Sequence, residues 1–455
     1  MNHVWQRAAG LALAVLLLAG CGRQPFVPDV PDDYRPVAVR DVEHFPQDLD
    51  WFAERAGNDV RLRDESRAAE DAARFRKLFY AAWDISRPGK GNADFFGAEL
   101  ARSGAARGYA ENLQPWDGDR WQRMVLNADW SNFPSLRAAA VTVRATSLRL
   151  APTALPRFER PSDPGEGYPF DMFQQTALPL GFPLMLLHRT LDGAWYYAES
   201  SLASGWVAAE DVALADETFQ NAWRALPLAA FTRDGVPLND RTGNWLAAAN
   251  LGTVLPLAGD EGSALRVLTP VRDAEGRAVL VSARVDKSAA AAMPLPLTPR
   301  RVADVGASLM GQPYGWGGLN GDRDCSAMLR DLFTPFGVWL PRNSAAQARS
   351  GRFVDLTGGT PAARESRILA EGRPFATLLW LPGHIGLYVG EYQGQAAFFH
   401  NLWGLRTRDE NGREGRHVLG RAVITSTRPG SELPSVPDNA LLLNRMKGMT
   451  FVSYD

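Results

Sequence analysis

The sequence predicts a multidomain chain with a helical N-terminal region, two small β-barrels and a C-terminal α+β domain. Its 455 residues exceed what one hydrophobic core normally serves. Apolar residues recur at helical spacing before residue 86, and in short alternating runs from about 138 to 290. After residue 297, a helical pattern that carries one cysteine precedes strand patterns that carry histidines, which indicates an α+β arrangement.

Charge and cysteine content exclude several classes of protein. The chain has 49 Lys and Arg against 51 Asp and Glu, with no basic block, so we expect no nucleic-acid partner. Cys21 and Cys325 are the only cysteines, and each has its own explanation below, so no disulfide framework is needed. No Cys/His group has zinc-ligand spacing and HExxH is absent. We therefore expect no metal site.

Residues 1–20 have the pattern of an export signal. Arg7 precedes an apolar run over 11–19 that is too short to span a bilayer as a mature helix. Leu18-Ala19-Gly20-Cys21 resembles a bacterial lipobox, which implies cleavage before Cys21 and acylation of its thiol. Several acyl chains anchor a protein stably. Gly22 then favours the periplasmic face of the outer membrane, with residues 21–36 as a tether. The alternative is a plain secretory signal with an incidental cysteine.

Residues 37–135 are predicted to form the helical N-terminal region. Between residues 61 and 85, apolar side chains recur at helical spacing, and Pro88-Gly89 ends the pattern: Ala68, Ala72, Phe75, Phe79 and Ala82. Tryptophans at 116, 121 and 130 follow in a stretch that we interpret as rich in loops. No chemistry is evident in this region.

Residues 136–215 and 216–292 are each predicted to form a small β domain. The first has strand patterns over 182–188 and 194–198, and then Gly205-Trp206-Val207, which resembles the last-strand element of bacterial SH3 modules. The second has strand patterns over 253–257, 265–270 and 278–285, but lacks that element. One larger β domain is the alternative. Residues 288–296, rich in Ala and Pro, are predicted to be a linker.

The C-terminal domain is predicted to cover residues 297–445. Thr298 and Pro299 are typical of the start of a helix. A glycine-rich loop leads to Asp324-Cys325-Ser326, and a second apolar-periodic helix runs from there to about Gly337. Strand patterns follow over 375–381, 384–389, 396–400 and 421–425.

Cys325, His384 and His400 are the candidate catalytic residues. A helix N-terminus lowers the pKa of a thiol, and a neighbouring imidazole completes its activation. His384 opens one strand and His400 closes the next, so a hairpin turning over 390–395 brings them together. His384 would then be the base and His400 the group that orients it. Taken singly, each residue also suits a buried structural position.

Five segments resemble the NlpC/P60 family of papain-like cysteine peptidases, with the match covering about 297–430. They are Pro313-Tyr314-Gly315-Trp316-Gly317-Gly318, Asp324-Cys325-Ser326, Leu340-Pro341-Arg342-Asn343-Ser344-Ala345-Ala346-Gln347, Pro382-Gly383-His384-Ile385-Gly386-Leu387-Tyr388-Val389-Gly390 and Phe399-His400. The resemblance implies a papain-like α+β fold and a Cys, His, His catalytic set without a cofactor.

With two SH3-like modules in front, the layout is similar to γ-D-glutamyl-L-diamino acid endopeptidases. This likeness implies that Asp324 faces the ammonium group of a substrate, that Ser326 and Ser344 hold its polar groups, and that Tyr314 and Trp316 line the cleft. The first module is expected to add a residue, with Tyr168 and Asp171 as candidates. Structural roles are the alternatives: helix capping for Asp324 and Ser344, and packing for Tyr314 and Trp316.

The resemblance implies cleavage of the γ-D-Glu–diamino acid bond in peptidoglycan stem peptides, in particular those with a free N-terminal L-Ala. The expected partners are those peptides and, through the lipid anchor, a membrane. One alternative is an N-acetylmuramoyl-L-alanine amidase or an acyltransferase on the same scaffold. Another is a wall-binding lipoprotein without catalytic activity.

Overall fold

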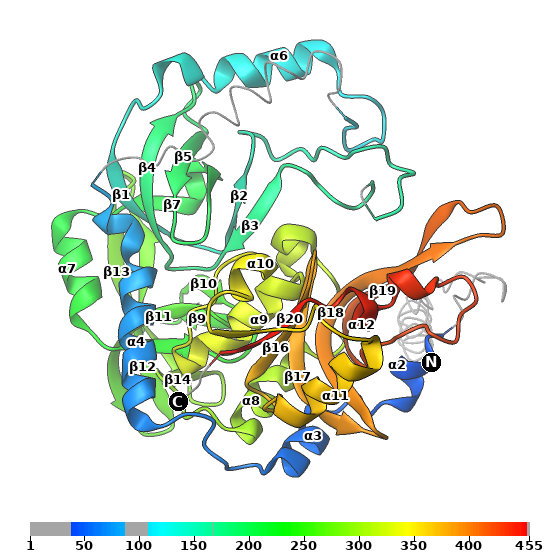
Figure 1. Ribbon diagram of the computed structural model, residues 1–455. Helices are drawn as coiled ribbons and strands as arrows, with labels where there is room; N and C mark the ends of the chain where they lie inside the picture. Colours follow the sequence, from blue (N-terminus) through cyan, green and yellow to red (C-terminus); the bar gives the residue numbers. More distant parts are fainter. Residues whose placement is uncertain (1–37, 87–107, 166, 453–455) are drawn as a thin grey trace, which may run out of the picture. The chain divides into compact units, whose positions relative to one another are not determined.

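The structure is a computed structural model that describes residues 38–86, 108–165 and 167–452 (Figure 1). It confirms the predicted fold class, with N-terminal helices, two small β domains and a C-terminal α+β domain. Cys21, the expected signal peptide and the tether lie outside the described residues. In the described ranges, no helix has the length and apolar character that crossing a membrane requires.

Asp side chains begin three helices of the N-terminal region, each by accepting a hydrogen bond from a first-turn N–H. One of them, α6, lies in the stretch around the tryptophans that we interpreted as rich in loops. We did not predict this helix, in which Asp117 is the N-cap and Trp121 and Met124 bury one face at i, i+3 spacing. The region contains α2 (Arg40–His44), α3 (Leu49–Ala56), α4 (Glu65–Phe79), η2 (Ala81–Asp84), α6 (Gly118–Asn127) and η3 (Trp130–Asn132).

The first β domain is a seven-stranded antiparallel sheet in the order β3-β2-β6-β5-β4-β1-β7. Gly205 is needed at the close approach of β6 to β2, where an added Cβ would lie 2.6 Å from the carbonyl oxygen of Arg149. Trp206 beside it is fully buried. The strands are β1 (Ala138–Thr142), β2 (Thr146–Arg149), β3 (Gln174–Leu178), β4 (Pro183–Arg189), β5 (Trp195–Glu199), β6 (Ser204–Ala208) and, after η4 (Ala209–Asp211), β7 (Val212–Leu214).

The second β domain follows α7 (Glu217–Ala225) and has a five-stranded sheet in the order β13-β12-β11-β8-β14. Part of the expected linker over 288–296 is in fact strand β14, which pairs with β8. Its run of small alanines gave no apolar alternation to detect. The strands are β8 (Leu228–Phe231), the paired β9 (Val236–Asn239) and β10 (Trp245–Ala249), β11 (Val254–Glu261), β12 (Ala264–Arg272), β13 (Ala278–Asp286) and β14 (Ala290–Ala292).

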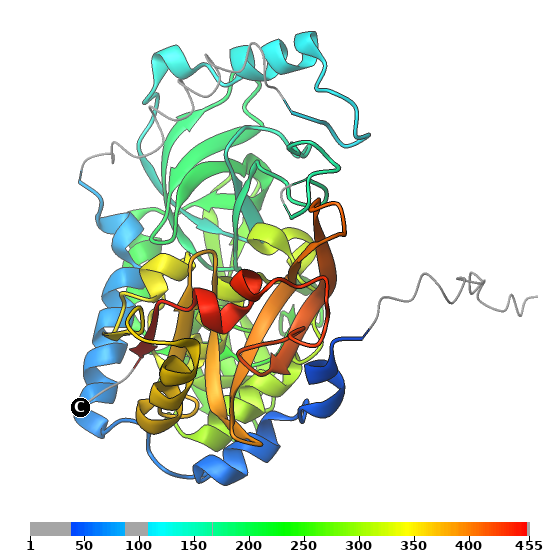
Figure 2. The ribbon, with the colours of Figure 1, turned by 45° about the vertical axis from the view of Figure 1, so that its right-hand side comes forward.

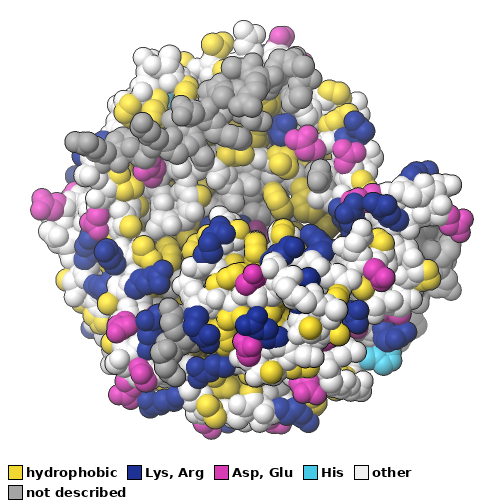
Figure 3. Space-filling model, in the orientation of Figure 1, with side chains coloured by type: hydrophobic (Ala, Val, Ile, Leu, Met, Phe, Trp, Pro, Cys, Tyr) yellow, Lys and Arg dark blue, Asp and Glu magenta, His cyan; other side chains and the backbone are white. Residues whose placement is uncertain are grey.

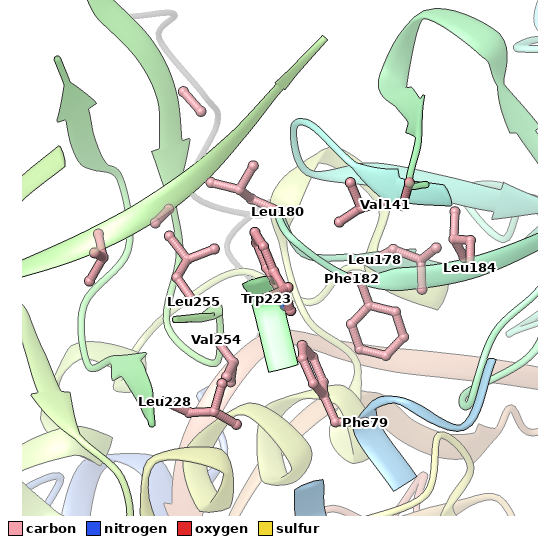
Figure 4. Packing of buried hydrophobic residues seen from close by; sticks show 14 of the residues in the cluster. Phe79, Val141, Leu178, Leu180, Phe182, Leu184, Trp223, Leu228, Val254 and Leu255 are labelled. Carbon is pink, nitrogen blue, oxygen red and sulfur yellow. The ribbon is translucent and has the colours of Figure 1, made fainter. Parts of the chain in front are cut away.

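Helix α4 and the two β domains share one hydrophobic core. Figure 4 shows Phe79 of α4 beside Trp223 of α7, with Phe182 and Leu255 from the two β domains around them. The guanidinium of Arg76 on α4 also donates to the carbonyl of Leu226, at 3.0 Å. Both ribbon views place α4 alongside the second β domain (Figures 1 and 2). Helix α4 and the two β domains therefore stabilise one another through this shared core.

The C-terminal domain contains a six-stranded antiparallel sheet in the order β15-β20-β16-β17-β18-β19. The helix start at Thr298 is as predicted, since its hydroxyl accepts from the N–H of Arg301. The elements are α8 (Pro299–Gly306), η5 (Ala307–Leu309), η6 (Trp316–Gly321), α9 (Cys325–Phe333), η7 (Thr334–Phe336), α10 (Ser344–Gln347), β15 (Arg352–Asp355), α11 (Pro361–Glu371), β16 (Thr377–Leu381), β17 (His384–Tyr392), β18 (Gln395–Arg408), β19 (Glu414–Thr425), η8 (Asp438–Ala440), α12 (Leu442–Arg445) and β20 (Gly448–Phe451).

Helices cover both faces of this sheet. Ile385, Leu387 and Val389 of β17 belong to the core formed with α3, α8 and α9, whereas Tyr388 belongs to the core formed with α11 and α12. This alternation follows from the two-residue period of a strand. The core on the first of these faces packs α9, which begins with Cys325, against β17, which begins with His384.

The β18–β19 hairpin is longer than predicted, running over 395–425 rather than only 396–400 and 421–425. The ribbon views show its tip projecting beyond the rest of the sheet (Figures 1 and 2). Its outer half is rich in charged residues, which hid the strand alternation in the sequence.

Candidate active site

Cys325 is the first residue of α9, directly after the helix cap. The Asp324 carboxylate accepts a hydrogen bond from the N–H of Ala327 at 2.9 Å, which fixes where the helix starts. The Cys325 side chain is buried, with 7% exposed. A backbone N–H at the first helical position has no acceptor inside the helix, so the Cys325 amide is available to a ligand.

The thiol has a raised pKa in this structure. Burial raises the pKa of Cys325 to about 12, and the Asp324 carboxylate acts in the same direction. The N–H groups of Ile385 and Ser326, both hydrogen-bonded to the sulfur, oppose this, as does the guanidinium of Arg342. The expectation of a lowered pKa was therefore wrong, because desolvation outweighs the helix N-terminus. The thiol is neutral at physiological pH.

His384 and His400 lie on adjacent strands, as the predicted hairpin requires. Nε2 of His384 is 2.8 Å from Nδ1 of His400. Gly386 makes room for this contact, since an added Cβ there would lie 2.7 Å from the Cβ of His400. Because the N–H of Ile385 donates to the Cys325 sulfur, the sulfur lies beside the start of β17, where His384 is.

A chain of hydrogen bonds fixes the tautomers of both imidazoles. The Thr425 hydroxyl donates to the carbonyl of Ser426 at 2.6 Å, so its oxygen accepts from Nε2–H of His400 at 3.1 Å. Nδ1 of His400 then carries no proton and accepts from Nε2–H of His384. This leaves the Nδ1 lone pair of His384 as the free acceptor of the ring. Thr425, which we did not predict, thus prepares His384 to act as a base.

Both histidines are held neutral. Burial, assisted by the positive charge of Arg445, lowers the pKa of His384 to about 3, and Asp324 opposes the shift. Burial and the neighbouring His384 lower the pKa of His400 well below its usual value. The structure therefore contains a neutral thiol beside a neutral imidazole, rather than a preformed ion pair.

We expect Thr425→Val to lower kcat/KM about 10-fold, and Thr425→Ser to stay within about 3-fold of the native enzyme. The valine leaves Nε2–H of His400 without an acceptor, which costs about 1–3 kcal/mol and favours the other tautomer. In that tautomer, Nδ1–H of His400 faces Nε2–H of His384. The ¹⁵N chemical shifts of the His400 ring report this exchange directly. An unchanged tautomer in an impaired Thr425→Val protein would contradict the role given to Thr425.

The Asp324 carboxylate is fully engaged by groups of the protein itself. Besides Ala327, its oxygens accept from the N–H of Gly317 at 3.2 Å and the hydroxyl of Ser326 at 3.1 Å. The Arg342 guanidinium binds it in bidentate fashion, at 2.5 and 3.1 Å. These donors lower the pKa of Asp324 against its burial. An ammonium group can therefore reach this carboxylate directly only by displacing a protein donor.

The hydroxyl of Ser326 is likewise occupied, since it also accepts from Arg342 at 2.9 Å. Ser344 is the first residue of α10, but Asn343 caps that helix through a 2.8 Å hydrogen bond from the N–H of Ala346. The alternative role of Ser344 as the helix cap is thus wrong. Gln347 ties α10 to α9 by donating to the carbonyl of Ser326 at 2.8 Å.

An aromatic cluster joins the glycine-rich loop to the first β domain. The Phe170 ring lies 5.2 Å from Trp316, 6.5 Å from Tyr314 and 5.3 Å from Trp403 of β18. Burial, together with the charges of Cys325 and Asp324, raises the pKa of Tyr314, so its hydroxyl stays protonated. Phe170 and Trp403 were not predicted, because single aromatic residues in loops and strands are most often packing residues.

Neither of the two candidates from the first β domain joins this cluster. Asp171 is buried in an ion pair with Arg149 at 2.9 Å. The Tyr168 ring is mostly exposed and packs on Phe158. Phe170, which lies between them in the sequence, is the residue that this domain contributes.

Both β domains hold the loop that precedes Cys325. The guanidinium of Arg342 donates to the hydroxyl of Thr176 in β3 at 2.6 Å, in addition to binding Asp324. From the second β domain, Asp234 forms a bidentate ion pair with Arg323, at 2.7 and 2.9 Å. Arg323 also pairs with Asp331 of α9 at 2.7 Å. The domain contacts thus fix the residues on either side of the nucleophile motif.

Comparison with known families recovers the same order of domains. The family models described as an NLPC_P60 stabilising domain, an SH3 domain of SH3b1 type, an SH3 domain of SH3b2 type and the NlpC/P60 family match residues 11–133, 156–208, 216–260 and 311–412. The last range includes the loop of Tyr314, the nucleophile motif and both histidines.

Solved and curated proteins agree with this. The structure is similar to an NlpC/P60 endopeptidase from Photobacterium damselae subsp. piscicida, with a TM-score of 0.80 and 25% identity, covering 89% of this chain and 97% of that one. A γ-D-glutamyl-L-lysine dipeptidyl-peptidase from Bacillus subtilis (strain 168) is 32% identical over 20% of this chain. A Corynebacterium glutamicum protein named as a probable endopeptidase is 32% identical over 24%. These matches span 30% and 47% of the two curated relatives.

Proposed function

Because the chain belongs to the NlpC/P60 family, we propose that it is a cysteine peptidase that hydrolyses peptidoglycan peptides at the γ-D-Glu–diamino acid bond. One observation carries this proposal. The sulfur of Cys325 accepts the N–H of Ile385, which directly follows His384. Hydrogen bonds from His384 through His400 to Thr425 leave Nδ1 of His384 unprotonated. A buried sulfur beside an oriented base suits acyl transfer.

The reaction begins with proton transfer during attack. The sulfur of Cys325 attacks the scissile carbonyl carbon while its proton moves to Nδ1 of His384, since both groups are neutral beforehand. The carbonyl oxygen becomes an oxyanion, and the Cys325 N–H and the Tyr314 hydroxyl are the donors that we propose for it. One such donor is worth about 3 kcal/mol. His384 then protonates the leaving amine, a thioester forms, and water hydrolyses it with His384 again as the base.

Features of the first β domain support a substrate with a free N-terminus. Phe170 packs on Trp316 and Tyr314, and Gln174 donates to the carbonyl of Gly317 at 3.1 Å, so this domain covers one side of the nucleophile loop. A cleft covered on one side favours short peptides over internal sites in a chain. The relative named as a dipeptidyl-peptidase supports the same preference.

The substrate L-Ala-γ-D-Glu-diamino acid, tested with a free and with an acetylated amine, measures this preference. We expect acetylation to lower kcat/KM about 100-fold, since the ammonium group would take the place of a protein donor at Asp324 and such a buried charge contact is worth about 2–5 kcal/mol. Mass analysis of the products identifies the bond that is broken. Equal turnover of both peptides would contradict the free-amine preference. Release of whole peptide from the lactyl group of muropeptides would instead identify an amidase.

Residues 18–21 alone support the location that we propose, an acylated Cys21 on the periplasmic face of the outer membrane. The intact mass of the mature protein tests it, because acylation after cleavage leaves a chain that starts at Cys21. An unmodified chain that starts elsewhere would contradict the anchor.

A further inference from the structure

Three guanidinium groups lie near the start of β17. Arg445, the last residue of α12, donates through Nη2 to the carbonyl oxygen of Pro382 at 3.1 Å, on the turn that leads into His384. Arg406 and Arg416 come from the paired strands β18 and β19, where they stand opposite each other. Packing of Leu405 with Leu441 in one hydrophobic cluster brings this part of the hairpin next to α12.

Among the residues that the structure describes, positive charge exceeds negative charge in this group. Glu414 pairs with both Arg406, at 2.5 Å, and Arg416, at 2.7 Å. Within the described residues, no Asp or Glu lies within ion-pair distance of Arg445. Burial and then the charges of Arg406 and Arg416 lower the pKa of Arg445, as expected for cations that repel one another. A carboxylate entering here would relieve this repulsion.

The location suits the leaving half of the substrate. His384 gives its proton to the leaving amine, so the leaving diamino acid lies on the side of His384. The carbon of its α-carboxylate is two bonds from that nitrogen. Arg445 donates to the carbonyl oxygen of Pro382, which comes two residues before His384 in the sequence. On the face drawn in Figure 3, Lys and Arg side chains lie along the lower border of the central recess, over the C-terminal domain.

We propose that Arg445, supported by Arg406 and Arg416, binds the α-carboxylate of the diamino acid that leaves. This inference rests on the proposed function and adds a preference for peptides that end at the diamino acid. Arg445 binds the substrate and takes no part in proton transfer. A guanidinium bound to a carboxylate in such a site contributes about 10-fold or more in kcat/KM.

The test compares two substrates, L-Ala-γ-D-Glu-diamino acid with a free α-carboxylate and the same peptide with an α-carboxamide. We expect the native enzyme to prefer the carboxylate by about 10-fold or more in kcat/KM. Arg445→Gln should reduce this ratio to about 1, while Arg445→Lys, which keeps the charge, should keep most of it. The ratio cancels any effect of Arg445 on His384, because that effect is common to both substrates.

Arg408→Gln is the matched control, since Arg408 is an exposed arginine on the same strand as Arg406. It should leave the ratio unchanged. A native enzyme that cleaves both peptides equally, or an Arg445→Gln protein that keeps the native ratio, would overturn the inference and leave the peptidase proposal standing. Failure of the native enzyme to cleave either peptide would count against the peptidase proposal itself. A purely structural role for Arg445 would lower both rates equally.

Discussion

Cys325→Ala is expected to lower kcat by at least about 10⁴-fold, with a change of only about 1 kcal/mol in the free energy of unfolding. The loss is large because no other group can form the thioester, and removal of a nucleophile has effects of this size. The fold should persist because Asp324 still caps α9 and the sulfur is a small part of the hydrophobic core on its face of the sheet, while the core on the other face does not contain it. Turnover of the tripeptide and urea unfolding measure the two quantities.

The double variant Cys325→Ala, His384→Gln sharpens this test. Residues that act as one unit give non-additive losses, so the double variant should be no slower than Cys325→Ala alone. Retention of substrate binding by Cys325→Ala, measured by calorimetry, would show that the cleft is intact. Activity within 10-fold of the native enzyme in Cys325→Ala would rule out this nucleophile. Additive losses would mean that His384 acts independently of the thiol.

The fold was predictable where the sequence signals were local. Thr298 and Pro299 gave the start of α8, the Asp324 motif gave the start of α9, and the strands at 384 and 396 paired as expected. Strand β14 was missed because three alanines show no alternation and only pairing with β8 orders them. The outer part of the β18–β19 hairpin was missed because both of its faces carry polar residues. Such elements depend on partners that are distant in the sequence.

In the active site, residue types and their order indicated Cys325, His384 and His400, but not the forces that act on them. The helix start suggested an acidic thiol, whereas the depth of burial, which spacing does not reveal, reverses the direction of the pKa shift. Thr425 follows His400 by 25 residues and reaches it only through strand pairing. Arg342 lies in one of the segments that resemble the family. Its ion pair with Asp324 was not predicted, because we expected Asp324 to face the ammonium group of a substrate.

Removing one partner of the ion pair between Asp324 and Arg342 should destabilise the folded protein far more than breaking a surface ion pair does. Both side chains are about 10% exposed, and Arg342 also reaches Thr176 of the first β domain. Arg342→Gln leaves a buried carboxylate without its cation, which costs about 3–5 kcal/mol. We expect the free energy of unfolding to fall by that amount, measured by urea titration.

A double-mutant cycle with Asp324→Asn separates the ion pair from the loss of packing. The double variant should be less destabilised than the sum of the two single variants, because the asparagine leaves no unpaired charge when Arg342 is gone. Acid gives a second readout. The pKa of Asp324 is lowered by folding, so its contribution is present above the ordinary value of 3.8 and is lost as the pH falls below it. Asp324→Asn should lack that part of the acid dependence, whereas strictly additive effects would show that Asp324 and Arg342 stabilise the loop separately.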